Sequence, residues 1–220
     1  MKKLLLTLTF CVATTLSFSA CNKPNTNNTN SKPQPDVVQK GTKPQPDSEV
    51  AVIETNDFGK IVIELYPNVA PKMVERFKAL IKDGTYNGTT FHRIDPSLGI
   101  IQGGDPLSKD ADPTNDGTGD SKLPDLTAEF SDIQFETGTV ASARQGGNNN
   151  SANCQFFITL RRQPSFEMEG NRYTIFGKVI QGMTNVNTIA GAPKAEGAER
   201  PDPPIVVKSM TLEPRTNYVK

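Results

Sequence analysis

The sequence predicts an all-β fold, a closed eight-stranded antiparallel barrel capped by two α-helices. Eight short runs of β-branched and aromatic residues follow one another from Val50 onward, and such runs are typical of strands. Only two stretches have a helical pattern, and most connections are irregular loops. Closing such a sheet into a barrel would leave no exposed strand edges, so we expect closure.

The first three elements are a hairpin and a helix. VAVIET (50–55) and KIVIEL (60–65) flank NDFG, which predicts a turn between two strands. The stretch PKMVERFKALIKDG (71–84) follows, with Pro71 suited to a first helical turn and Gly84 to a C-terminal end. Its apolar side chains recur with a helical period, at Val74, Phe77, Leu80 and Ile81.

Six further strands and a second helix complete the predicted domain. The strands are TFHRI (90–94), LGIIQ (98–102), TVASA (139–143), CQFFITL (154–160), TIFGKVI (174–180) and PIVVKSMTL (204–212). The helix, TNVNTIAG (184–191), separates the last two strands. These elements predict one domain over residues 49–213 and a short C-terminal tail, 214–220.

Residues 1–20 predict a signal peptide. Lys2 and Lys3 precede an apolar stretch that is too short to span a bilayer. Small residues then lead into Cys21, which resembles the bacterial lipoprotein signal, although Phe18 stands where that signal usually carries Leu. We therefore expect an extracytoplasmic lipoprotein anchored to a membrane through a lipid on Cys21. Ordinary secretion is the alternative.

Residues 21–48 predict a disordered tether between this anchor and the domain. The stretch is rich in Pro and Asn and has almost no apolar residues, so it cannot bury enough surface to offset the entropy of ordering. The sequence KPQPD occurs twice, at 32–36 and 43–47, which is too few copies for a repeat array. Fully extended at roughly 3 Å per residue, the tether would span about 80 Å.

Charge and composition exclude several functions. The 24 basic residues balance 24 acidic ones, but residues 48–220 hold 18 basic against 22 acidic residues, so no nucleic-acid partner is expected. The acidic loop 110–120 lacks the glycine and glutamate of an EF-hand loop. The single histidine, His92, excludes histidine-built metal sites and catalytic triads. Beyond the leader and the anchor only Cys154 remains, so we expect a monomer without an internal disulfide.

Polar and aromatic residues on separate predicted strands form one candidate site. Arg93, Gln102 and the stretch QFF (155–157) lie on three of the strands. Arginine stays protonated and offers five donors, so it can stabilise developing charge without exchanging a proton. Phe157 offers an apolar wall. On this pattern alone, a surface ion pair at Arg93 and an ordinary core at QFF are the simpler explanation.

Residues 50–212 nevertheless resemble a cyclophilin-type peptidyl-prolyl isomerase, and bacterial members most closely. The matching segments occur in family order: IVIELYPNVAPKMVERF, GTYNGTTFHRI, IIQGGDP, LTAEF, GTVASAR, SANCQFFITL and YTIFGKVIQGM. The resemblance implies a cyclophilin-like barrel and cis–trans isomerisation of proline-containing polypeptides, with neither a metal nor an organic cofactor.

The resemblance also implies roles for individual residues. Arg93 matches the catalytic arginine and Gln102 the active-site glutamine. Substrate-binding roles fall on Phe157 and Ile100 in the proline pocket, and on Ala143, Arg144 and Gln155 in the groove for the residues before proline. One extra residue between Phe91 and Gln102 removes the usual aromatic of the pocket floor, where Leu98 can substitute. Phe166 or Met168 stands near the family's tryptophan, and Tyr173 stands where eukaryotic members carry histidine.

The function expected from these residues is to assist the folding of exported proteins by binding the twisted Xaa–Pro amide. A proline-peptide-binding chaperone or scaffold with little turnover is the alternative. Adjacent strand residues face opposite sides of a sheet. If Arg93 lines the groove, His92 points away from it, and we expect a hydrogen-bonded structural histidine there.

Overall fold

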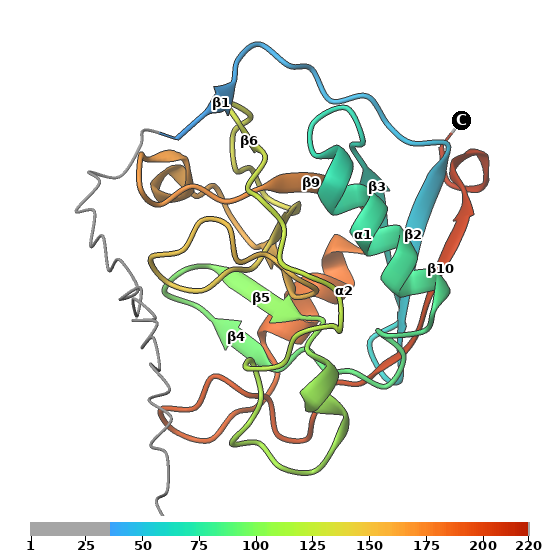
Figure 1. Ribbon diagram of the computed structural model, residues 1–220. Coiled ribbons are helices and arrows are strands. Elements are labelled where there is room, and N and C mark those ends of the chain that lie inside the picture. The colour runs from blue at the N-terminus through green and yellow to red at the C-terminus, as the bar shows by residue number, and fades with distance from the viewer. Residues whose placement is uncertain (1–35, 220) are drawn as a thin grey trace, which may run out of the picture. The chain divides into compact units, whose positions relative to one another are not determined.

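The eight predicted strands form one antiparallel sheet in the order β10-β2-β3-β9-β7-β8-β5-β4, and Figure 1 shows β10, β2 and β3 side by side at one end of it. This computed structural model describes residues 36–219; the predicted signal peptide, Cys21 and the tether residues up to 35 lie outside the described residues. The strands are β2 (Glu49–Thr55), β3 (Lys60–Leu65), β4 (Arg93–Asp95), β5 (Ile100–Gly103), β7 (Thr139–Ser142), β8 (Phe156–Thr159), β9 (Ile175–Gln181) and β10 (Val207–Pro214).

The sheet curves into an open half-barrel, so the prediction of a closed barrel is wrong. β4 and β10 end the sheet, and within residues 36–219 the segments before them meet at one isolated bridge, Thr90–Val206. β4 has only three residues. The segment before β10 contains four prolines, which cannot donate to a ladder: Pro193, Pro201, Pro203 and Pro204. Both features prevent a continuous closing pair.

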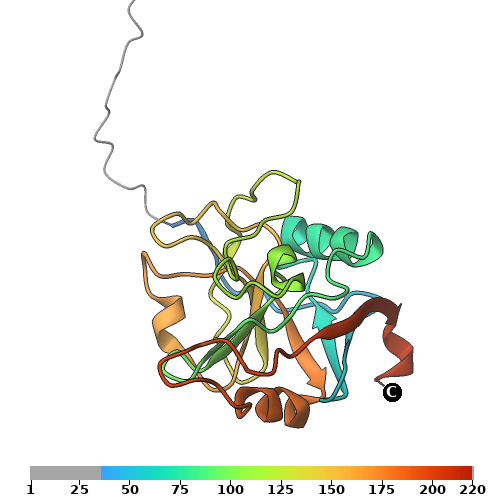
Figure 2. The same cartoon turned by 90° about the horizontal axis from the view of Figure 1, so that it is seen from below.

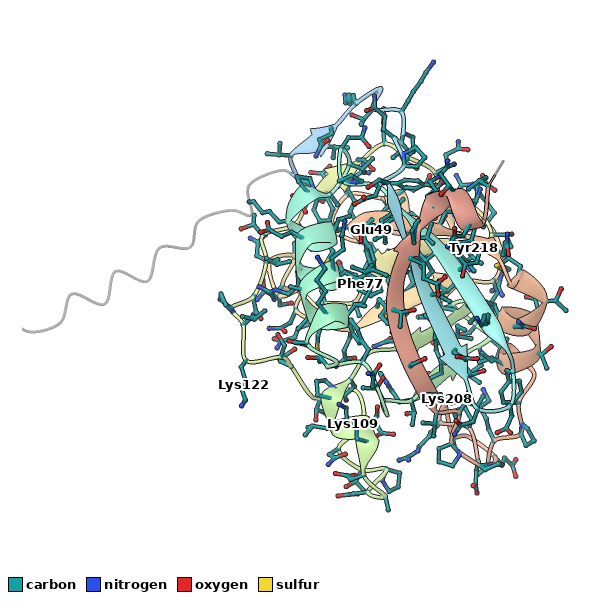
Figure 3. The ribbon with its side chains drawn as sticks, turned by 90° about the vertical axis from the view of Figure 1, so that its right-hand side faces the viewer. Glu49, Phe77, Lys109, Lys122, Lys208 and Tyr218 are labelled. Carbon is teal, nitrogen blue, oxygen red and sulfur yellow. The ribbon has the colours of Figure 1, made fainter. Side chains whose placement is uncertain are left out.

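Two helices pack on the sheet, α1 (Pro71–Lys82) and α2 (Met183–Ala190), and Figure 2 shows them on opposite sides of it. The apolar face of α1 lies in the main core, where the Phe77 ring contacts Tyr86, Phe156 and Phe176 at centroid distances of 4.9 to 5.4 Å. Figure 3 shows Phe77 between α1 and the strands. Neither helix is long and apolar enough to cross a membrane, and this holds for all of residues 36–219.

The end of the expected tether is part of the domain. Within residues 36–48, β1 (Val38–Gln39) pairs in parallel with β6 (Phe130–Ser131). Asp36 accepts a hydrogen bond from the Asn149 side chain (2.8 Å), and Asp47 forms an ion pair with Lys78 (2.8 Å). Residues 36–48 are therefore packed on the domain that was predicted to begin at residue 49, because polar contacts replace the apolar burial that this segment lacks.

The expected C-terminal tail is also held on the domain. Arg215 forms an ion pair with Glu64 of β3 (2.7 Å), and a 3₁₀ turn follows at Arg215–Asn217. Tyr218 packs against the valines on the outer face of β2 and β3, and its hydroxyl donates to Glu213 (2.7 Å). Figure 3 shows Tyr218 at this end of the sheet. The domain boundary predicted at 213 therefore lies too early.

Candidate functional site

A straight row of side chains crosses four neighbouring strands of the sheet. Arg93 on β4 lies opposite Gln102 on β5, Gln102 opposite Phe157 on β8, and Phe157 opposite Ala141 on β7. Residues that lie directly opposite in antiparallel strands share one face of the sheet. The ladder register therefore brings together the arginine, the glutamine and the phenylalanine that the sequence placed on separate strands.

Arg93 is held on three sides by polar partners. Its Nη1 donates to Gln102 Oε1 (3.4 Å), its Nη2 to Asp95 Oδ2 (2.7 Å) and its Nε to Glu199 Oε2 (2.6 Å). Burial opposes the charged form of Arg93, but the hydrogen bond that Arg93 donates to Glu199 and the negative charges of Glu199 and Asp95 outweigh it and raise the pKa of Arg93. The guanidinium therefore stays charged and fixed in orientation at the row's outer end.

Asp95 is the buried support of this arginine. It lies two residues after Arg93 on β4, and therefore on the same face of the strand. Burial favours its neutral form, but hydrogen bonds from Ser97 and Leu98 and the charge of Arg93 together hold its pKa below the ordinary value. Asp95 is thus an anion that orients the Arg93 fork.

A chain of hydrogen bonds fixes Gln102 from its other side. Gln102 Nε2 donates to Gln155 Oε1 (3.0 Å), and Gln155 Nε2 donates to the carbonyls of Gly117 (3.1 Å) and Gly119 (2.9 Å). These contacts also fix the amide orientations: Gln102 turns its oxygen to Arg93 and its nitrogen to Gln155. The polar row is therefore preorganised.

The buried carboxylate of Asp105 holds the loop that orients Gln155. Asp105 accepts hydrogen bonds from the backbone N–H groups of Gly117, Gly119 and Leu107 and is fully buried. The preceding Gly104 has φ +88°, and a β-carbon there would lie 2.9 Å from a backbone oxygen of Cys154, so glycine is required. The GGD sequence thus has a structural role beside the site.

An apolar cluster of rings, the aromatic cluster, lies beside this polar row. Phe157 contacts three aromatic rings at centroid distances of 5.2 to 6.3 Å: those of Phe135, Phe166 and Tyr173. Ile100 is buried in the same cluster, because it lies two residues before Gln102 and shares its face of β5. Phe166 and Ile100 therefore lie in one buried cluster with Phe157.

A groove of about 310 Å³ opens next to the aromatic cluster. Its wall includes four residues that sequence analysis selected, Gln102, Ala143, Arg144 and Gln155, and the remainder comes from the loops 117–120 and 145–153. The Arg144 guanidinium lies 4.5 Å from the centre of the Tyr173 ring, a cation–π contact. The groove thus joins the polar row at Gln102.

Two of the predicted site residues lie apart from this arrangement. The Leu98 and Met168 side chains are 36% and 64% exposed, and neither belongs to the aromatic cluster. Phe135 occupies the place beside Phe157 for which Leu98 was expected. Sequence reasoning missed Phe135, Asp95 and Glu199. Of these only Asp95 carried a local signal, its two-residue spacing from Arg93.

His92 lies behind the groove, as expected, but without the expected hydrogen bond. Its ring is 5% exposed, and neither ring nitrogen has a hydrogen-bond partner among residues 36–219. Burial lowers its pKa to about 4, although the nearby Asp105 charge acts in the opposite direction. A neutral, buried imidazole is a packing residue at physiological pH and is no candidate for proton transfer.

Metal-ligating side chains are scattered within the described part of the chain. No group of three or more His, Cys, Asp or Glu side chains among these residues is arranged to hold a metal ion. The free thiol of Cys154 is buried, and burial raises its pKa to about 12, so this cysteine is a poor nucleophile at neutral pH.

Comparison with known proteins agrees with this geometry. Residues 50–212 match the family model described as cyclophilin type peptidyl-prolyl cis-trans isomerase/CLD. A "Probable peptidyl-prolyl cis-trans isomerase" from Brucella suis biovar 1 is 39% identical over 184 residues, which cover 82% of this chain and 90% of the relative. The "Peptidyl-prolyl cis-trans isomerase-like 3" of Gallus gallus is 35% identical over 169 residues, covering 74% and 96%.

Solved structures give the same result. A cyclophilin type peptidyl-prolyl cis-trans isomerase from Cryptosporidium parvum superposes with a TM-score of 0.65 at 29% identity, covering 75% of this chain and 97% of its own. The same protein in the presence of the dipeptide Ala-Pro matches with a TM-score of 0.65 as well. The chain therefore belongs to the family of cyclophilin-type peptidyl-prolyl cis–trans isomerases.

Proposed function

We propose that this isomerase acts without a covalent step, by binding the twisted Xaa–Pro amide more tightly than either planar form. Rotation about a peptide bond is opposed by roughly 18–20 kcal/mol, because the nitrogen lone pair is delocalised into the carbonyl. In the twisted state the prolyl nitrogen regains its lone pair and can accept a hydrogen bond. A donor aimed at that nitrogen accelerates rotation, since its contribution appears only in the transition state.

The observation that carries this proposal is the fixed guanidinium of Arg93 in line with Gln102 and Phe157. Of its N–H groups, one on Nη1 is not used by Gln102, Asp95 or Glu199. A charge-assisted hydrogen bond contributes roughly 1.5–3 kcal/mol, which is about one to two powers of ten in rate. The aromatic cluster supplies an apolar surface for the proline ring, and the fixed polar row supplies preorganisation.

The substrate class is a proline-containing polypeptide. The groove of about 310 Å³ beside Gln102, lined by Ala143 and Arg144, has room for side chains of residues that precede proline. The related Cryptosporidium parvum structure in the presence of Ala-Pro supports a ligand of this kind. The residues before proline lie in the groove, and the proline ring lies between Phe157 and Arg93.

The decisive experiment separates turnover from binding. The full chain in mild detergent should accelerate isomerisation of an Ala-Pro peptide, and Arg93→Ala should remove most of that rate while still binding the peptide. Refolding of a proline-limited protein is then compared for the two proteins. If Arg93→Ala assists refolding as well as the original chain does, the alternative of a chaperone or scaffold with little turnover is correct.

We also propose that the protein acts on exported polypeptides as a membrane-anchored lipoprotein on the extracytoplasmic side. The support is the sequence of residues 1–21, in which a short apolar leader ends in small residues and Cys21. Cys21→Ser should move the protein from the membrane fraction to the soluble fraction of the same cells. An unmodified Cys21 in the intact mass of the native protein would contradict the anchor.

A further inference from the structure

The loop between α2 and β10 brings a second carboxylate to Arg93. Its residues 194–201 follow the outer edge of β4, where Glu199 O accepts from the Ile94 N–H (2.7 Å) and Lys194 Nζ donates to Ile94 O (2.8 Å). An isolated bridge between Lys194 and Pro201 ties the two ends of this loop together. The backbone of Glu199 is therefore fixed against the strand that carries Arg93.

The Glu199 carboxylate lies on the outer side of the guanidinium. Its Oε2 is 2.6 Å from Arg93 Nε, and its Oε1 is 3.3 Å from Nη2. The Glu199 side chain is 50% exposed, whereas that of Asp95 is 8% exposed. Asp95 is thus a buried support of Arg93, and Glu199 is a charge that solvent and substrate can reach.

Asp95 and Glu199 both pair with the Arg93 guanidinium. Of the two basic residues of the loop, Arg200 lies 2.9 Å from Asp116. Lys194 Nζ donates to the Ile94 carbonyl, a contact that leaves its positive charge in place beside β4. Among residues 36–219 the Glu199 carboxylate forms its ion pair with Arg93 alone, and it stays half exposed at the outer edge of the site, where a basic side chain can reach it.

The groove and Glu199 lie on opposite sides of Arg93. Gln102 and Gln155, which line the groove, extend from Arg93 toward β8, whereas Glu199 lies at the free edge of β4. A peptide with its preceding residues in the groove and its prolyl amide at Arg93 must continue toward Glu199. This placement rests on the function proposed above. We propose that Glu199 selects substrates with a basic side chain at the first position after proline.

The expected preference of the enzyme for a basic residue after proline has the size of a partly exposed ion pair. Such a pair changes kcat/KM by about two- to five-fold, so lysine should exceed glutamine by that factor. A glutamate at the same position meets a like charge and should be disfavoured by a similar factor. Lysine and glutamate substrates should therefore differ by roughly ten-fold.

The test compares three peptides, Ala-Ala-Pro-Xaa-Ala with Xaa as Lys, Gln or Glu, by exchange NMR on the full chain in mild detergent. The original protein should prefer Lys, then Gln, then Glu. Glu199→Gln should bring the three kcat/KM values to within about two-fold of one another. The matched control is Glu196→Gln, which removes the same charge from an exposed position on the same loop and should keep the preference. The preference should also shrink between 0.05 and 0.5 M salt, because exposed charges are screened.

The outcomes separate this inference from the function on which it rests. Equal rates for the three peptides in the original protein would overturn the inference and leave the isomerase activity standing. A uniform fall in Glu199→Gln with the preference retained would show that Glu199 only positions Arg93, and the inference would be wrong. Failure to turn over any of the peptides would overturn both, since the inference places the substrate by the proposed mechanism.

Discussion

Phe135 stacks on Phe157, with ring centroids 6.3 Å apart and planes inclined by 13°. Phe135 lies on the connection between β6 and β7, outside every strand of the sheet. It also meets Phe166 edge to face at 5.5 Å. A loop residue thus supports the ring that faces the site, in the place where the segment before β5 was expected to supply the contact.

Phe135→Ala should lower both stability and catalysis. Removing a buried phenylalanine ring costs about 3–5 kcal/mol, and the cavity would let Phe157 tilt away from the polar row. Phe77→Ala is the matched control, because Phe77 is equally buried but belongs to the main core. Both variants should melt earlier, and only Phe135→Ala should lose kcat/KM per folded molecule. An equal loss of kcat/KM in both would show that general loosening is the cause.

Arg93→Lys should lose most of the activity although it keeps the charge. A lysine ammonium cannot hold the fork geometry with which Arg93 meets Gln102, Asp95 and Glu199 at once. We expect kcat/KM to fall about ten- to hundred-fold with little change in the melting temperature. Activity close to that of the original chain would mean that positive charge alone is sufficient and that the geometry proposed here is unnecessary.

His92→Gln should change the pH dependence of stability. The folded-state pKa is about 4, and that of an unfolded histidine is about 6.5. Between pH 4 and 6.5 the unfolded chain therefore binds more protons than the folded chain, so the free energy of unfolding rises with pH over this window. Above about pH 6.5 this free energy no longer depends on His92 titration, and the folded state has its full stability. The lowered pKa accounts for a rise of up to about 3 kcal/mol in the free energy of unfolding across this window. His92→Gln should remove that rise, which urea unfolding measured from pH 4 to 7 would show.

A plot of kcat/KM against pH for the original chain should show no inflection near pH 6.5. An inflection there would mean that His92 titrates at its ordinary pKa in the folded protein, contrary to its burial. A folded but inactive His92→Gln would give His92 a role in the reaction.

Phe166→Trp should raise the affinity for cyclosporin, because the resemblance to cyclophilins implies that a tryptophan near this position binds that inhibitor. Phe166 contacts Phe157 and Tyr173 at the edge of the cluster, whereas Met168 is exposed. Met168→Trp is therefore the control and should not gain affinity. The chain has no tryptophan of its own, so fluorescence of the introduced residue reports binding directly. A gain in Met168→Trp alone would reverse the assignment.

Local sequence was sufficient to predict the strands and helices of the sheet domain. The features that were missed or wrong depend on tertiary contacts. All eight strands and both helices were predicted because periodicity and turn residues act over short ranges. The β1–β6 pair was missed because two-residue strands have no period. Glu199 was missed because its contact with Arg93 joins positions 106 residues apart. The prediction of a closed barrel was wrong because the prolines before β10 cannot donate the hydrogen bonds that a closing pair of strands needs. This loss outweighs the general advantage of a sheet without exposed edges.

Sequence motifs also predicted the residues that face the site, but not the residues that hold them in place. Arg93, Gln102, Ile100 and Phe157 were placed by motif, and the ladder register then brings them onto one face. Phe135 and the Asp105-held loop came only from packing, since neither has a motif that predicts its neighbours.

The pairing of β10 with β2 sets the order in which the domain can be completed. Leu212 lies opposite Ala51, and Pro214 opposite Glu49, so one edge of the sheet joins nearly the first and the last residues of the domain. A ribosome must therefore release almost the whole domain before this pair can form. Contacts between such distant residues slow folding, so the growing chain cannot complete its sheet until nearly all of its residues are available, and the last strand to be synthesised closes the sheet on the first hairpin.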